Sequence, residues 1–393
     1  MHILAFTTIE YPLENPRGWG AERRFRALSR RLIVDGIRLI GIGYSEVAIA
    51  SPEGIDYTLP KNKRWKLLRL VIAGTSLTRR LKCDALYAYH SDPVEVVVPT
   101  YLCALICGKP FFVVVHDDAK RTEDSSTITQ LIRTELTGRR RHFPRKVVHL
   151  SIDILRRIAI RRARACICVS QFSANYALHV LHSPSVVVTG NGVEDGWFQD
   201  KEGSKKFEAV FMGRIERRKG VDSLLEAWRL VNLKLPDARL VLIGSMEKAE
   251  GRHINRLVSE LRLAKNVTFA GYVSDSEAER LVQSSQVFIL PSRKEGFGLV
   301  VAEAMASGVP CIISDIPALL ENFQGASQVV SADDSDALAQ AILTLLGDAK
   351  LRERLAREGR ALAKEFTWDK VSAREAAVIF GALDMIPVGS RRK

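Results

Sequence analysis

Two glutamates flank a glycine-containing turn in RKEGFGLVVAEAMASGVPCII, which runs from Arg293 to Ile313. Glu295 precedes the turn, and Glu303 follows it inside a segment with helical periodicity. Glycine lets the backbone approach a ligand closely, and the N–H groups and dipole at a helix N-terminus favour a diphosphate. Carboxylates do not bind phosphate but accept hydrogen bonds from sugar hydroxyls. The spacing of the glutamates alone carries no weight, but the whole construction fits a nucleotide-sugar.

A second candidate site is the loop GRIERRKG, which Arg214 and Lys219 flank. Two fixed cations beside a diphosphate would stabilise the charge that develops on a leaving group. The intervening Arg217 and Arg218 fit an ordinary solvated loop. His116 ends the apolar run FFVVVH, where it fits either a hydrogen-bonded surface residue or a group beside a reaction centre.

The elements that would position these residues are apolar strands that alternate with helices. QVFILPS reads as a buried strand, and LVVAEAMASG reads as a helix that ends at a glycine. The stretch from Arg293 to Gly298 is then a strand-to-helix loop at the carboxyl end of a parallel sheet, where open α/β folds bind ligands. The other expected strands are HILAFTT, RLIGIGY, ALYAYH, PFFVVVHD, ACICVS, SVVVTGNG, EAVFMGRI, ARLVLIGS, NVTFAGYV and VPCIISD. This alternation predicts doubly wound sheets that are covered on both faces.

A length of 393 residues predicts two domains. The segment 191–206 is polar and without pattern, and we interpret it as a linker between an N-terminal domain, 1–190, and a second domain, 207–367. The formal net charge is +13, and residues 1–190 account for all of it with 29 Lys+Arg against 16 Asp+Glu. This asymmetry predicts an anionic partner for the first domain: a membrane surface, a lipid phosphate, a polyanionic glycan or nucleic acid.

The six cysteines form no CxxC pair, which favours reduced thiols and a cytosolic compartment. The chain opens without a recognisable signal peptide, and the apolar stretch 94–107 is too short to span a bilayer. Asp334-Ser335-Asp336 resembles a metal-binding DxD, but it opens a helical segment and reads as an N-cap.

The stretch EGFGLVVAE followed by AMASGVPCIISD resembles the donor-site signature of retaining GT-B glycosyltransferases of the family-four type, the glycosyl transferases group 1. Further stretches match in the expected order, more closely in the second half of the chain: GWGAE, VVVHDD, ICVSQFSA, NGVE, MGRIERRKG and FTWDKVS. The resemblance implies two Rossmann-like domains that face a cleft, and a C-terminal helix and basic tail, 368–393, that return to the first domain.

The resemblance also implies transfer of a sugar from a UDP-, GDP- or ADP-sugar, with retention of configuration and without a metal or other cofactor. Glu303 would hold the ribose and Glu295 the donor sugar, while Arg214 and Lys219 hold the diphosphate. The implied donor-binding residues are Gly20, Arg214, Lys219, Glu295, Gly296, Phe297, Gly298, Leu299, Val300 and Glu303, and the implied catalytic residues are His116, Glu295, Arg214 and Lys219. The chain departs from the usual pattern at Trp19, between two glycines, and at Asp117 and Asp118.

The acceptor stays open, with a lipid-linked or glycan acceptor at the cytoplasmic membrane face expected from the basic first domain. One alternative is a hydrolysing nucleotide-sugar epimerase of the same fold. Another is a non-catalytic protein that binds a membrane or nucleic acid through its arginine clusters. RNA binding would require exposed aromatic residues among the arginines, and Trp65 and Phe143 offer few, so nucleic acid is the less favoured partner.

Overall fold

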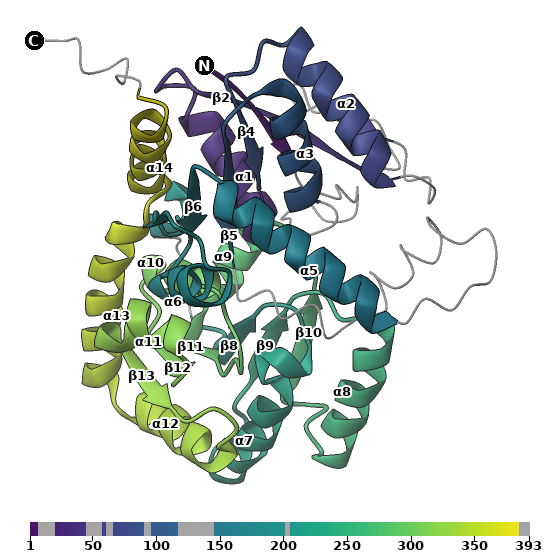
Figure 1. Cartoon of the computed structure of the whole chain (residues 1–393). Helices are drawn as coiled ribbons and strands as arrows, with labels where there is room; N and C mark the ends of the chain where they lie inside the picture. The colour runs from purple at the N-terminus through teal and green to yellow at the C-terminus, as the bar shows by residue number, and fades with distance from the viewer. Residues whose placement is uncertain are drawn as a thin grey trace, which may run out of the picture. The chain divides into compact units, whose positions relative to one another are not determined.

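The computed structural model describes residues 1–6, 20–44, 57–59, 66–89, 96–116, 145–200 and 205–384. The chain folds into two compact units (Figure 1). Unit 1 contains the described residues up to Gly190 together with those from Val371 on, and unit 2 contains Asn191–Lys370. No helix in these described ranges is long and apolar enough to cross a membrane.

Unit 1 is built on a seven-stranded parallel sheet with the order β3-β2-β1-β4-β5-β6-β7. Its strands are β1 (His2–Phe6), β2 (Arg38–Tyr44), β3 (Tyr57–Leu59), β4 (Ala85–Ala88), β5 (Phe111–Val115), β6 (Ala165–Cys168) and β7 (Val186–Val188). Its helices include α1 (Gly20–Arg31), α2 (Lys66–Arg80), α3 (Val98–Cys107), α5 (Arg145–Arg162), α6 (Gln171–Asn175) and the π-helix η3 (Tyr176–Val180). The central strands β4, β5 and β6 are buried along their whole length, as their continuous apolar sequences predict.

Unit 2 contains a six-stranded parallel sheet with the order β10-β9-β8-β11-β12-β13. Its strands are β8 (Phe207–Met212), β9 (Leu240–Ile243), β10 (Val267–Gly271), β11 (Ser285–Leu290), β12 (Cys311–Ser314) and β13 (Ser327–Val330). The order reverses between β8 and β11, so the loops after these two strands lie at the topological switch point of the sheet. The fold therefore confirms the prediction of two Rossmann-like, doubly wound domains.

The helices of unit 2 are α7 (Val221–Lys234), α8 (Lys248–Glu260), α9 (Asp275–Gln283), α10 (Leu299–Ala306), α11 (Pro317–Phe323), α12 (Ser335–Gly347) and α13 (Ala349–Ala363). Short 3-10 turns lie at η4 (Asp195–Phe198), η5 (Arg217–Lys219), η6 (Gln324–Ala326) and η7 (Lys364–Phe366). Asp334 caps α12, because its carboxylate accepts a hydrogen bond of 2.8 Å from the Ala337 N–H. The N-cap prediction for the DxD-like triplet is confirmed.

The start of the segment predicted as a linker, 191–206, is packed into unit 2 instead. The Val193 N–H donates to the Phe366 carbonyl at 2.6 Å, and Trp197 is only 1% exposed. The Ser307 hydroxyl donates to the Trp197 carbonyl at 3.3 Å. The polar composition of the segment favours a linker, and only the fold shows that Val193 and Trp197 are buried in unit 2.

The last described helix, α14 (Trp368–Ala382), begins in unit 2 and belongs to unit 1 from Val371 on. Its Glu375 is fully buried and forms an ion pair with the fully buried Arg24 of α1. Arg24 also donates to the Thr189 hydroxyl at 2.9 Å and to the Gly190 carbonyl. The return of the C-terminal helix to the first unit is thus confirmed, and a buried charge pair holds it there.

Two arginines that the sequence places in surface charge clusters are therefore interior residues. Arg24 is fully buried, and Arg156 of α5 is 3% exposed. Helical periodicity explains Arg156, because its neighbours three and four positions on, Ala159 and Ile160, are both buried in the core of unit 1.

Candidate functional site

Two loops of unit 2 hold most of the candidate residues: the β8–α7 loop and the β11–α10 loop. Gly220 ends the first loop with φ +69°, and a Cβ atom at this position would lie 2.0 Å from the Pro291 carbonyl oxygen of the second. Only glycine permits this approach of one backbone to the other. The switch point therefore brings together two loops whose candidate site residues lie about 75 positions apart in the chain.

Lys219 and Glu295 meet across these two loops. The Lys219 Nζ lies 2.6 Å from Glu295 Oε1, and their side chains are 13% and 9% exposed. The Ser292 hydroxyl donates to the same carboxylate oxygen at 2.8 Å. Burial alone would raise the pKa of Glu295, but the Lys219 charge and the hydrogen bonds from Lys219 and Ser292 hold that pKa below its ordinary value. Glu295 is thus an ionised, fixed acceptor of hydrogen bonds.

Arg214 lies earlier in the β8–α7 loop, where Glu216 is its neighbour. Arg214 Nη2 is 3.4 Å from Glu216 Oε1, and Arg218 Nε donates to the same oxygen at 3.0 Å. The Arg217 side chain is 72% exposed, in agreement with the prediction of a solvated position. The loop therefore offers more cations than carboxylates.

Helix α10 begins directly after the second loop. Gly298, its N-cap, has φ +92°, and a Cβ atom there would lie 2.5 Å from Leu319 Cδ2. The next residues, Leu299 and Val300, are partly exposed and form the first turn, whose N–H groups have no acceptor within the helix. The positive end of the dipole and these N–H groups form a site that suits an anion.

The side chain of Phe297, one of the predicted donor-site residues, packs against other aromatic rings. It is 4% exposed and lies edge-to-face against Phe323 and Phe366, with ring centroids 5.7 Å and 5.4 Å apart. This side chain belongs to the interior of unit 2.

Glu303, in the second turn of α10, is fully buried. A fully buried glutamate is unusual, and the other residues of this helix, LVVAEAMA, are all apolar.

The two candidates of the first half belong to unit 1. His116 follows β5, and its Nε2 lies 3.2 Å from the Tyr89 carbonyl oxygen. Since a carbonyl oxygen only accepts, this contact places a proton on Nε2. Gly20 is the first residue of α1. The loop before it, with Trp19, and Asp117 and Asp118 after His116 lie outside the described residues.

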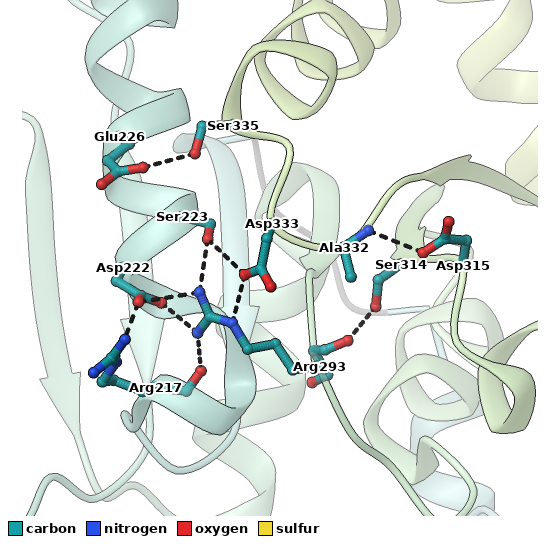
Figure 2. A network of polar contacts seen from close by, with 11 residues as sticks. Arg217, Asp222, Ser223, Glu226, Arg293, Ser314, Asp315, Ala332, Asp333 and Ser335 are labelled. Atoms are coloured by element: carbon teal, nitrogen blue, oxygen red, sulfur yellow. Dashed lines mark hydrogen bonds and ion pairs between the residues drawn. The ribbon is translucent and has the colours of Figure 1, made fainter.

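The sequence did not single out the side chain that joins the two loops most extensively, Arg293 (Figure 2). It forms an ion pair with Asp222 of α7 at 2.7 Å and another with Asp333, which follows β13. Its partners come from other loops, so no spacing in the sequence indicates them. Ser292 was also missed, although its position three residues before Glu295 is a local signal for a hydrogen bond.

No group of three or more His, Cys, Asp or Glu side chains within the described ranges could hold a metal ion.

Residues 195–362 match the family model described as glycosyl transferases group 1. The O-antigen chain mannosyltransferase B of Escherichia coli is 32% identical over 161 residues, which are 41% of this chain and 42% of that protein. The phosphatidyl-myo-inositol mannosyltransferase of Mycolicibacterium smegmatis is 29% identical over 219 residues, or 53% of this chain and 54% of that protein. The matched region thus spans about half the length of these curated relatives or less.

Among solved structures, HepE of Anabaena in complex with UDP-glucose superimposes with a TM-score of 0.76 at 18% identity, over 97% of this chain and all of that one. A sucrose-phosphate synthase from Thermosynechococcus elongatus gives a TM-score of 0.74 at 18% identity, over 98% of this chain and 99% of that one. At this identity the likeness concerns the fold alone. The chain has the GT-B fold, and its residues 195–362 match the family model of the glycosyl transferases group 1.

Proposed function

We propose that this protein is a glycosyltransferase that moves a sugar from a nucleotide-diphosphate sugar to an acceptor. The observation that carries the proposal is the Lys219–Glu295 pair at the switch point, next to the N-terminus of α10 and inside the region that matches the family model. A cation, a fixed carboxylate and a helix N-terminus are together the groups that a sugar diphosphate requires.

In this proposal the diphosphate lies against Lys219, Arg214 and the first turn of α10. Positive groups beside the β-phosphate stabilise the charge that develops as the glycosidic bond breaks, so the chain's own side chains serve in place of a metal ion. Glu295 would hold donor-sugar hydroxyls and Glu303 the ribose. By family resemblance, His116 and Gly20 of unit 1 are further candidate residues for the reaction. Retention of configuration belongs to the proposal through family resemblance, and the donor stays open among UDP-, GDP- and ADP-sugars.

We further propose that the acceptor is a lipid-linked or glycan molecule at the cytoplasmic face of a membrane. Helix α5 supports this, because five exposed side chains follow one another at helical spacing along one face: Ile154, Leu155, Ile158, Arg161 and Arg162. Apolar side chains beside arginines on one helix face suit an anionic lipid surface. Nucleic acid is a weaker candidate partner.

A thermal-shift panel of UDP-, GDP- and ADP-sugars, each measured with EDTA, tests the donor site. We expect one nucleotide class to stabilise the protein, by about 2.7 kcal/mol at a ligand concentration a hundred times the dissociation constant. Lys219→Ala should abolish that shift. Arg354→Ala, which removes an exposed arginine of α13, should keep it.

Stabilisation by none of the donors would contradict the proposal. Once the base is known, the products separate the remaining alternatives. Transfer to an acceptor supports a glycosyltransferase, whereas a free epimerised sugar with released nucleotide would identify a hydrolysing epimerase of the same fold.

A further inference from the structure

Arg293 joins three loops of unit 2 through one guanidinium group (Figure 2). Its Nη1 and Nη2 donate to the two carboxylate oxygens of Asp222 at 2.7 Å and 3.1 Å, a bidentate pair. Nη2 also donates to the Ser223 hydroxyl at 3.0 Å, Nη1 to the Arg217 carbonyl, and Nε to Asp333. These contacts use all five N–H donors of the side chain.

The backbone of Arg293 makes the same connection. Its N–H donates to the Arg218 carbonyl at 2.9 Å. The β8–α7 loop is therefore tied to the β11–α10 loop at Arg217 and at Arg218, the two residues directly before Lys219. On the other loop, the tie lies two residues before Glu295. The contacts of Arg293 therefore hold the two loops together directly beside the Lys219–Glu295 pair.

The surroundings of Arg293 require an arginine. Its side chain is 28% exposed, and the hydrogen bonds that it donates to Asp222 raise its pKa above the ordinary value. A lysine has three donors on a freely rotating ammonium and would not reproduce the planar, bidentate arrangement. Asp333 also adopts a left-handed backbone, with φ +69°, a conformation that is unfavourable for a residue with a Cβ atom. Such strain persists where surrounding contacts hold it, and here Arg293 and Ser223 both contact the Asp333 carboxylate.

We infer that Arg293 is a positioning residue for sugar transfer, which holds the β8–α7 loop against the β11–α10 loop so that the Lys219 ammonium and the Glu295 carboxylate present one fixed geometry to the donor. The role in sugar transfer rests on the proposed function. The clamp, by which we mean the contacts of Arg293 that join the two loops, does not depend on it. Arg293 does not need to touch the donor for this role.

The first experiment measures donor turnover by Arg293→Ala. A displacement of catalytic groups by about 1 Å can lower the rate on the order of a hundredfold, and we expect a loss of this size in kcat/KM. Millimolar guanidinium, far below denaturing concentrations, should restore part of the lost activity because it can occupy the site beside Asp222. Arg354→Ala is the matched control, and its activity should stay at the wild-type level with or without guanidinium.

The second experiment needs no activity. The Lys219 ammonium is nearly buried and paired, so an amine-reactive reagent should label it slowly in the wild-type protein, as measured by mass spectrometry of the Lys219 peptide. Arg293→Ala should increase this labelling rate several-fold, while Arg354→Ala leaves it unchanged. If Arg293→Ala does not fold, Asp222→Asn removes the charge of the bidentate partner and should change labelling and turnover in the same direction.

The outcomes separate the two proposals. Faster labelling together with lower, guanidinium-rescued turnover supports the positioning role. Faster labelling in a protein that turns over no nucleotide-sugar at all supports the clamp and rejects the proposed function. Labelling and turnover at the wild-type level in Arg293→Ala and Asp222→Asn would overturn the inference. A loss of activity that follows only from a lower melting temperature, and that guanidinium does not rescue, would overturn it as well.

Discussion

At the scale of single residues, Glu295 shows how two opposing effects set the state of one carboxyl group. Burial disfavours the charged form, while Lys219 and Ser292 favour it. The second effect is larger, so the folded-state pKa lies below the ordinary value. In the proposed function, this ionised carboxylate would accept hydrogen bonds from sugar hydroxyls.

This shift predicts a particular pH dependence of stability. Since the folded-state pKa lies below 4.5, the ionised form stabilises the folded state above pH 4.5, and this contribution is lost as the pH falls through the folded-state value. The melting temperature of the wild-type protein should therefore exceed that of Glu295→Gln by a constant amount near neutral pH, and the difference should shrink on acidification below 4.5. A melting-temperature difference that stays constant down to acid pH would contradict this assignment. Ser292→Ala should keep the direction of the pH dependence but reduce its size, because it removes one of the hydrogen bonds that lower the pKa of Glu295.

At the scale of elements, the buried pair of Arg24 and Glu375 connects the first helix of unit 1 to the last. Burial by itself would lower the pKa of Arg24, but the Glu375 carboxylate raises it, so the guanidinium stays charged. The Tyr87 hydroxyl donates to the second oxygen of the same carboxylate. Helix α14 is therefore held to unit 1 by a charge network and not only by apolar packing.

Removal of one partner should be costly because it leaves the other charge buried. We expect Glu375→Gln to destabilise unit 1 by about 3–5 kcal/mol, measured in urea as the shift of the first unfolding transition. The double variant Arg24→Met/Glu375→Leu should recover part of this loss, since well-packed apolar side chains can replace a buried pair. Equal destabilisation by the single and the double variant would show that the charges themselves are not the cause.

At the scale of the whole molecule, the net positive charge lies in the sequence before Asn191, and the sequence from Asn191 on has no net charge. Helix α5 combines this charge with exposed apolar side chains on one face. A catalytic domain that binds a soluble donor has no need of such a face. A domain that takes an acceptor from a membrane does, because the surface concentrates the enzyme beside its substrate.

Flotation with anionic vesicles at low salt tests this proposal. Each basic side chain near such a surface contributes about 1 kcal/mol, so Arg161→Gln/Arg162→Gln should lower the partition coefficient roughly 30-fold. The matched control, Lys350→Gln/Arg354→Gln, removes two exposed charges from α13 of unit 2 and should bind as the wild-type protein does. Failure of the wild-type protein to float would reject the membrane surface as a partner.

The sequence by itself predicted most of the strands, although not β3 or β13, and the resemblance to a family. The strands, the helix α10 after its glycine turn and the N-cap at Asp334 all depend on periodicity and residue type within a few positions, and the family motifs are contiguous. Only the tertiary structure decided which charges are buried and which side chains meet. Arg293 finds Asp222 at a separation of 71 positions, and Arg24 finds Glu375 at 351. Such pairs depend on strand order and on the close approach of separate loops, and local patterns in the chain contain neither.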